Sequence, residues 1–261
     1  MSQYKRSFLF KLPFESIKMR LFTTFSYLLF YGFLSAQKEE PTLFLNIQYG
    51  THSPVLDMKN RFGSSLRTTA VFAYQTPKKR SVWSAVGFFQ FGALVKENVF
   101  SNLLTPEGYL IGNDKNPAVI QLRQRAWFLG FGRGWRFNNK SVFIKRLNVD
   151  VYGGFFQHKI RIQDDPSRVV PQISGEYRKG YDRLSNGPGA LVNFSYNPTA
   201  KPLLTRFVVG IDLFAAPTWN RRPVNFNTAV KDDAVFWVFQ PGIHLGYHFP
   251  RVFKNPASLK Y

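Results

Sequence analysis

Apolar and polar residues alternate along most of this chain with a period of two. Such alternation is typical of β-strands whose two faces meet different surroundings. In the last such stretch, one face carries aromatic and aliphatic residues and the other carries Gln, Gly and His. The pattern predicts eight strands, at 43–51, 65–76, 81–95, 122–136, 146–162, 188–197, 203–215 and 234–249. Most of them reach the roughly 9–11 residues that a tilted strand needs to cross a bilayer.

The links between the predicted strands alternate in length. Short links at 76–80, 137–145 and 198–202 carry Pro, Asn and Lys, as tight turns do. The long links follow the first, third, fifth and seventh strands, at 52–64, 96–121, 163–187 and 216–233. An up-and-down barrel would place all four long loops at one end, as in bacterial outer-membrane proteins. We therefore predict an all-β fold, an eight-stranded antiparallel up-and-down transmembrane β-barrel.

The composition of the two faces favours a barrel with its apolar side outward. A soluble eight-stranded barrel, with its apolar side inward, is the alternative. The polar face is rich in glycine, which suits the crowded lumen of so small a barrel. Aromatic residues lie near the strand ends of the apolar face, where a membrane interface would favour them. We expect the protein to lie in the outer membrane of a Gram-negative cell envelope, in contact with its lipid.

Four polar residues on the inward face are candidates for a lumen network. We predict that Asp150, Arg206, Asp212 and His244 form a buried hydrogen-bonded plug. Asp212 and His244 fall near the middle of adjacent strands. Eight strands leave an interior that side chains can fill, so a conducting pore is not expected.

The N-terminus has the pattern of an export signal. Residues 21–34 are uncharged and largely apolar, Arg20 precedes them, and Ser35-Ala36 offers a cleavage site. We interpret 1–36 as a signal peptide and 37–261 as the barrel domain, with a short basic tail at 250–261. Translation could start at Met1 or at Met19, and the exact cleavage site stays open.

The charge of the chain is strongly positive. It has 261 residues, with 35 Lys and Arg against 15 Asp and Glu, and no Cys. The lack of Cys excludes disulfides and thiol chemistry. Basic residues gather in the short turns and the tail, so we expect a positive rim at the periplasmic end. A nucleic-acid partner is not expected of an exported barrel.

The sequence contains no established catalytic pattern. The four His lie outside any HExxH arrangement, and no GxSxG or Walker pattern is present. We predict no catalytic residue, cofactor or metal site. Two alternatives stay open: His52 could act with Asp164 or Asp165 in a lipid-modifying enzyme, and the pairs Asp164-Asp165 and Asp232-Asp233 could hold Ca²⁺.

The third long loop mixes charged, Tyr and Pro residues and is longer than a turn requires. Long loops of this kind are usually functional. We expect this loop to contact a protein partner, with a cap that stiffens the barrel mouth as the alternative. The candidate contact residues are Arg161, Asp164, Asp165, Arg178, Lys179 and Arg183.

Taken together, the alternating segments and the final strand GIHLGYHF resemble the small eight-stranded outer-membrane barrels. The match is to OmpX/OmpW-like proteins and, more weakly, to PorT-like proteins, which are associated with the type IX secretion apparatus. The resemblance implies a non-enzymatic structural or accessory subunit of a secretion or surface-assembly complex. The alternatives are a lipid-modifying enzyme and a binder or transporter of small hydrophobic molecules.

Overall fold

The computed structural model describes residues 42–75, 81–137, 141–165, 167–197 and 206–249. The chain divides into two units, 1–40 and Pro41–Tyr261, and only the second is described here. The predicted signal peptide, the basic tail and most of the basic short-turn residues lie outside the described residues.

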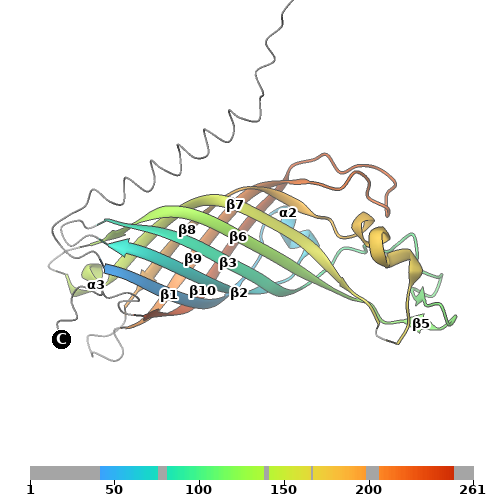
Figure 1. The fold of residues 1–261 in the computed structure, drawn as a ribbon, viewed down its shortest axis with the longest axis horizontal. Helices are drawn as coiled ribbons and strands as arrows, with labels where there is room; N and C mark the ends of the chain where they lie inside the picture. Colours follow the sequence, from blue (N-terminus) through green and yellow to red (C-terminus); the bar gives the residue numbers. More distant parts are fainter. Residues whose placement is uncertain (1–41, 76–80, 138–140, 166, 198–205, 250–261) are drawn as a thin grey trace, which may run out of the picture. The chain divides into compact units, whose positions relative to one another are not determined.

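Eight antiparallel strands form a closed barrel in the order β1-β10-β9-β8-β7-β6-β3-β2 (Figure 1). The barrel strands are β1 (Thr42–His52), β2 (Ser65–Gln75), β3 (Ser81–Leu94), β6 (Gln121–Arg136), β7 (Leu147–Gln163), β8 (Ser185–Tyr196), β9 (Phe207–Asn220) and β10 (Phe236–Phe249). Each strand pairs with its neighbours in the chain, and β1 pairs with β10 to close the sheet. Closure satisfies the backbone hydrogen bonds of every strand and leaves no edge, as a bilayer requires.

All eight predicted strands are present, and their boundaries differ from the prediction by a few residues. The largest difference is that β9 continues to Asn220, beyond the predicted end at 215. Between β8 and β9 the ladder pairs Asn186 with Trp219 and resumes at Ala190 with Ala215. Pro188 and Pro217 lie in the gap, where neither has an N–H to donate. These prolines obscured the strand in the sequence although the barrel tolerates them.

The apolar face of the strands points outward, as predicted. On β10, Trp237 and Leu245 are 53% and 55% exposed, whereas Gln240 and His244 are 1% and 6% exposed. Because the strands alternate in this way, most of the outer surface of the barrel is apolar. Such a surface is stable in acyl chains and not in water, so the fold is a transmembrane barrel.

The first long loop folds back over the mouth of the barrel. It contains the short helix α2 (Asp57–Arg61), which Figure 1 shows within the outline of the strands. Met58 and Phe62 are fully buried, and Gln240 Nε2 donates to Met58 Sδ over 3.0 Å. This loop therefore closes one end of the lumen.

The other long loops carry short elements of their own. The second loop contains the hairpin β4 (Leu110–Ile111) and β5 (Pro117–Ala118). The third contains two short 3₁₀ helices, η1 (Pro171–Ile173) and η2 (Gly175–Gly180). At the opposite end, the link between β6 and β7 includes the short helix α3 (Val142–Lys145).

Among the described residues, no helix is both long enough and apolar enough to cross a membrane.

Candidate functional site

A buried carboxylate organises the polar residues of the lumen. Asp212 Oδ2 lies 3.0 Å from His52 Nε2 and 3.4 Å from His244 Nδ1. Its Oδ1 accepts a hydrogen bond of 2.8 Å from Asn193 Nδ2. These four side chains come from β9, β1, β10 and β8, and each is 6% exposed or less. The carboxylate of Asp212 is thus surrounded inside the protein by polar side chains from three other strands.

Glycines make room for the two histidines beside Asp212. In the strand register, Gly242 lies between His52 on β1 and Asp212 on β9. A Cβ at Gly242 would lie only 2.0 Å from the His52 ring, and one at Gly210 would lie 2.4 Å from the His244 ring. The imidazoles can therefore cross their neighbouring strand only because these positions have no side chain.

Arg67 of β2 is the second buried charge of the lumen, with 1% exposure. Its Nη2 donates to Gln240 Oε1 over 3.0 Å. Its guanidinium lies 4.0 Å from the ring centroid of Phe88 and 5.5 Å from that of Phe214. Cation–π contacts in a desolvated setting stabilise the charged group by about 2 kcal/mol.

Four phenylalanines fill the lumen next to Arg67. Their ring centroids lie between 4.7 and 6.1 Å apart in the measured pairs. The rings are at most 4% exposed, and they belong to Phe88, Phe128, Phe156 and Phe214. Together with Arg67, they pack the interior with side chains in the way expected for eight strands.

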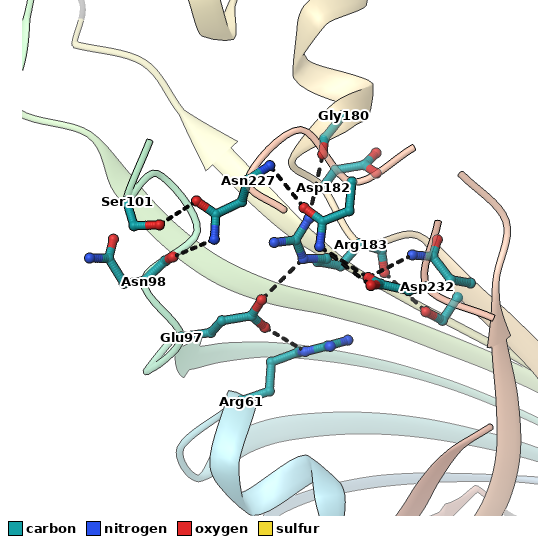
Figure 2. A network of polar contacts seen from close by, with 12 residues as sticks. Arg61, Glu97, Asn98, Ser101, Gly180, Asp182, Arg183, Asn227 and Asp232 are labelled. Carbon is teal, nitrogen blue, oxygen red and sulfur yellow. Dashed lines mark hydrogen bonds and ion pairs between the residues drawn. The ribbon is translucent and has the colours of Figure 1, made fainter. Parts of the chain in front are cut away.

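The four long loops form what we call the loop crown, made of residues 53–64, 95–120, 164–165, 167–184 and 221–235. Glu97 of the second loop joins the first loop to the third. Its Oε2 lies 2.7 Å from Arg61 Nε, and its Oε1 accepts a hydrogen bond of 3.1 Å from Arg183 Nε (Figure 2). One carboxylate thus holds two guanidinium groups from different loops.

Further polar pairs join the remaining loops. Arg222 Nε donates to Asp182 Oδ1 over 2.7 Å, and this hydrogen bond raises the pKa of Arg222. Asn227 accepts from Ser101 Oγ over 2.5 Å and donates to the Asn98 carbonyl over 3.3 Å (Figure 2). Every long loop is therefore bonded to at least one other, which makes the crown a single packed surface.

The structure brings together two of the four predicted lumen residues. Asp212 and His244 lie side by side, whereas Asp150 accepts from Arg136 Nη1 over 2.8 Å. The prediction for Arg206 is wrong. This residue is exposed, and its Nη1 donates to the hydroxyl of Tyr247 over 3.3 Å. It directly precedes the start of β9, where a long side chain can turn away from the lumen.

Several lumen residues were missed by the sequence prediction. They are His52, Arg67, Asn193 and Gln240. Each lies on the inward face of its strand, so the alternation of polar and apolar residues could have indicated that it faces the lumen. The predicted first strand ends at 51, which makes His52 a loop residue and a candidate for catalysis in the prediction, not part of the lumen network.

The predicted contact residues of the third loop differ in their availability. Arg183 is 2% exposed and holds Glu97, so its place in a contact surface is a wrong prediction. Arg161 belongs to strand β7 rather than to the loop. Arg178 forms an ion pair with Asp164, and Lys179 forms an exposed pair with Glu176.

Asp165 stabilises a turn and links two loops. Its carboxylate accepts from the Val119 N–H over 3.1 Å and from the Ser167 N–H over 2.8 Å. These hydrogen bonds, the one from Val119 first, lower the pKa of Asp165 below its ordinary value. The carboxylate is therefore occupied by backbone donors.

The alternative sites suggested by the sequence do not assemble in the described part of the chain. His52 lies against Asp212 instead of Asp164 or Asp165. Asp232 accepts from Asn220 and Asn225, and Asp233 pairs with Lys231. No three His, Asp or Glu side chains among the described residues gather as a metal site would require.

The closed sheet, the apolar exterior and the filled lumen define a class of protein. The chain is an integral outer-membrane β-barrel of the small eight-stranded type. In barrels of this class the long loops lie on the outside of the cell and the short turns face the periplasm. The predicted fold class is confirmed, and so is the outer-membrane part of the predicted location.

Comparison with solved structures returns outer-membrane proteins. Ail of Yersinia pestis is 15% identical, with 81% of this chain and 100% of that chain covered and a TM-score of 0.40. A major outer membrane protein from Thermus thermophilus is 10% identical, covering 79% and 99%, with a TM-score of 0.38. Neisserial surface protein A is 11% identical, covering 80% and 98%, with a TM-score of 0.37. No protein-family profile and no curated protein matches the chain.

Proposed function

We propose that this protein is a non-enzymatic outer-membrane barrel that serves as a structural or accessory subunit of a secretion or surface-assembly complex. In this proposal the loop crown binds a protein partner outside the cell, and the barrel anchors the crown in the membrane. The observation that carries the proposal is an apolar hollow in the loop crown, whose loops are joined to one another by hydrogen bonds and ion pairs.

The hollow has a volume of about 660 Å³ and is lined by three of the four long loops. Its walls include Leu103 of the second loop, Tyr177 of the third, and Val224 and Phe226 of the fourth. Tyr177 is 63% exposed. Exposed aromatic groups around a preformed hollow are typical of protein–protein contact sites.

The rigidity of the crown supports a role in binding. Residues held in place before binding lose less conformational freedom when a partner docks. The links through Glu97, Asp182 and Asn227 fix the loops that carry the hollow. Glu176 and Lys179, which lie on either side of Tyr177 in the chain, form an exposed ion pair.

The filled lumen favours an anchor over a transporter. The four phenylalanine rings and Arg67 occupy the interior, so a substrate passage would require them to move. The imidazoles of His52 and His158 are each 1% exposed. A lipid substrate would not reach them without opening of the barrel.

A photo-crosslinking experiment in intact cells tests the partner role. Tyr177 is replaced by a photoreactive phenylalanine analogue, and Tyr109, which is 55% exposed on the second loop but outside the hollow, serves as the matched control. We expect one discrete protein adduct from position 177 and none from 109. Absence of an adduct at 177, together with a clean monomer after purification in mild detergent, would refute the proposal.

A second measurement separates this role from the enzyme alternative. Ala replaces His52, His158 and Asp164 in turn, and the lipid composition of the outer membrane is measured. We expect it to stay unchanged in all three variants. A specific lipid species that accumulates in one variant would favour the enzyme.

A further inference from the structure

Four basic residues form two rows on the outward face of β6 and β7. Arg123 lies directly opposite Arg161, and Arg125 directly opposite Lys159. Cross-strand neighbours of this kind have Cβ atoms about 5 Å apart, and like charges placed so are destabilising. The two rows are two residues apart along the strands, or about 7 Å.

The side chains of these rows point toward the membrane and not into the lumen. They share the outward face with Trp127 and Phe155, whose ring centroids lie 5.4 Å apart. These two aromatic residues lie closer to the middle of the barrel along β6 and β7. The inward residues between them, Gln124 and Ile160, are fully buried. The rows therefore lie at the long-loop end of the barrel, just beyond an aromatic pair of the kind that marks the membrane interface.

Within the described part of the chain, no acidic side chain forms an ion pair with any of the four. Arg125 donates only to the neighbouring Gln124 carbonyl, over 3.0 Å, and it is repelled by the charges of Arg123 and Arg161. Lys159 and Arg161 also line a polar hollow of about 270 Å³. The two acids of this hollow are already neutralised, Asp164 by Arg178 and Asp182 by Arg222.

We infer that this basic ladder, made of Arg123, Arg125, Lys159 and Arg161, binds the phosphate groups of an anionic lipid in the outer leaflet. Arg donates two parallel hydrogen bonds to phosphate, and Lys supplies a compact charge, so two rows suit a headgroup with more than one phosphate. The acyl chains would lie along the apolar surface below, over Trp127 and Phe155. The site is independent of the partner role proposed for the loop crown.

Charge and position together indicate a lipid phosphate as the occupant. Four cations that lack protein acids need a counter-anion, and the outward face offers lipid as the nearest source. A free phosphate ion would satisfy the charge, but it would gain nothing from the aromatic surface beneath. A lipid phosphate gains from both.

The test uses the full mature chain in a maltoside detergent, which has no phosphate, with native mass spectrometry to count retained lipid. The probe is a bisphosphorylated lipid A, compared with the same lipid after removal of its phosphates and with inorganic phosphate alone. The variant is Arg123→Gln with Arg161→Gln. The control is Lys59→Gln with Lys115→Gln, two exposed loop lysines whose loss changes the net charge equally.

We expect the unmodified protein and the control to retain the phosphorylated lipid equally. The Arg123→Gln/Arg161→Gln variant should bind it at least about tenfold more weakly, because hydrogen bonds to charged groups are lost. Equal retention of the phosphorylated and dephosphorylated lipids would overturn the inference. Wild-type retention by the variant, or displacement of the lipid by inorganic phosphate alone at millimolar concentration, would overturn it too.

Thermal unfolding provides a readout that does not depend on retention. In detergent alone, the variant should be at least as stable as the unmodified protein, because repulsion within the ladder is relieved. Added phosphorylated lipid should raise the melting temperature of the unmodified protein and leave that of the variant unchanged. If the lipid stabilised both equally, the site would lie elsewhere.

Discussion

Phe88 and Phe89 are neighbours on β3 that face opposite sides of the barrel wall, and replacing each by Ala tests the packing of the lumen. Phe88 is 4% exposed, and its ring contacts Phe128, Phe156 and Phe214. Phe89 is 48% exposed toward the membrane. The two changes remove the same atoms from the same strand at nearly the same depth.

The expected loss differs because only one of the two spaces can be refilled. Phe88→Ala leaves a cavity between side chains held by a rigid sheet, for which about 3–5 kcal/mol is typical. The three ring contacts, at about 0.5–1.5 kcal/mol each, and the Arg67 contact place the loss near the upper end. Phe89→Ala loses burial in acyl chains, about 1.5–3 kcal/mol because lipid closes the gap, and one ring contact with Phe91, about 0.5–1.5 kcal/mol.

The assay is reversible urea unfolding of both variants in lipid vesicles, followed by tryptophan fluorescence. We expect Phe88→Ala to be the less stable by about 1–3 kcal/mol, the part due to the cavity and the additional ring contacts. Equal losses, or a greater loss for Phe89→Ala, would show that the lumen is not packed by these rings. The account of the barrel as a filled anchor would then fail.

Three further predictions concern the lumen and the loop crown. Because side chains fill the interior, the purified barrel should show no steady ion conductance in planar bilayers, and a stable open current would contradict this. Gly242→Ala would bring a methyl group against His52 and should destabilise the barrel by about 1–3 kcal/mol in the same urea assay. Gly153→Ala is the control, because a Cβ at this position has no atom within 4 Å, and it should change stability by less than about 0.5 kcal/mol. Backbone donors lower the pKa of Asp165, so its hydrogen bond to the second loop should be fully formed above the unfolded-state pKa of about 4 and be lost as the pH falls through the lower folded-state pKa. The amide NMR shifts of the linked residues should follow this titration in the unmodified protein and not in Asp165→Asn. A titration midpoint at or above about 4 would contradict the assignment.

The wall of the barrel could be predicted from the sequence because its cause is local. Each strand alternates with a period of two, and the backbone geometry alone then assigns neighbouring residues to opposite faces. The alternation of short and long links fixed the order of the strands. The boundaries of β8 and β9 differ from the prediction near Pro188 and Pro217. These prolines have no N–H group and interrupt the ladder between β8 and β9, but both strands continue past them in the closed barrel.

The contacts inside the lumen could not be predicted in the same way. A slip of two residues between neighbouring strands leaves every side chain on its face, so alternation does not determine which residues meet. The pairing of His52 with Asp212 depends on the register through Gly242 and on the closure of β1 against β10. Arg206 shows the same limit at a strand end, where its side chain turns outward to Tyr247.

The loop crown depended most on the tertiary structure. Arg183, a candidate for surface contact, has a positive φ of 49° and is buried against Glu97 from a loop 86 residues away. The sequence by itself determined a membrane barrel with its apolar face outward and its long loops at one end, because these properties follow from short-range pattern. Only the tertiary structure decided which charges are paired and which, like Arg123 and Arg161, have no acidic partner among the described residues, because ion pairing depends on distances between segments far apart in the chain.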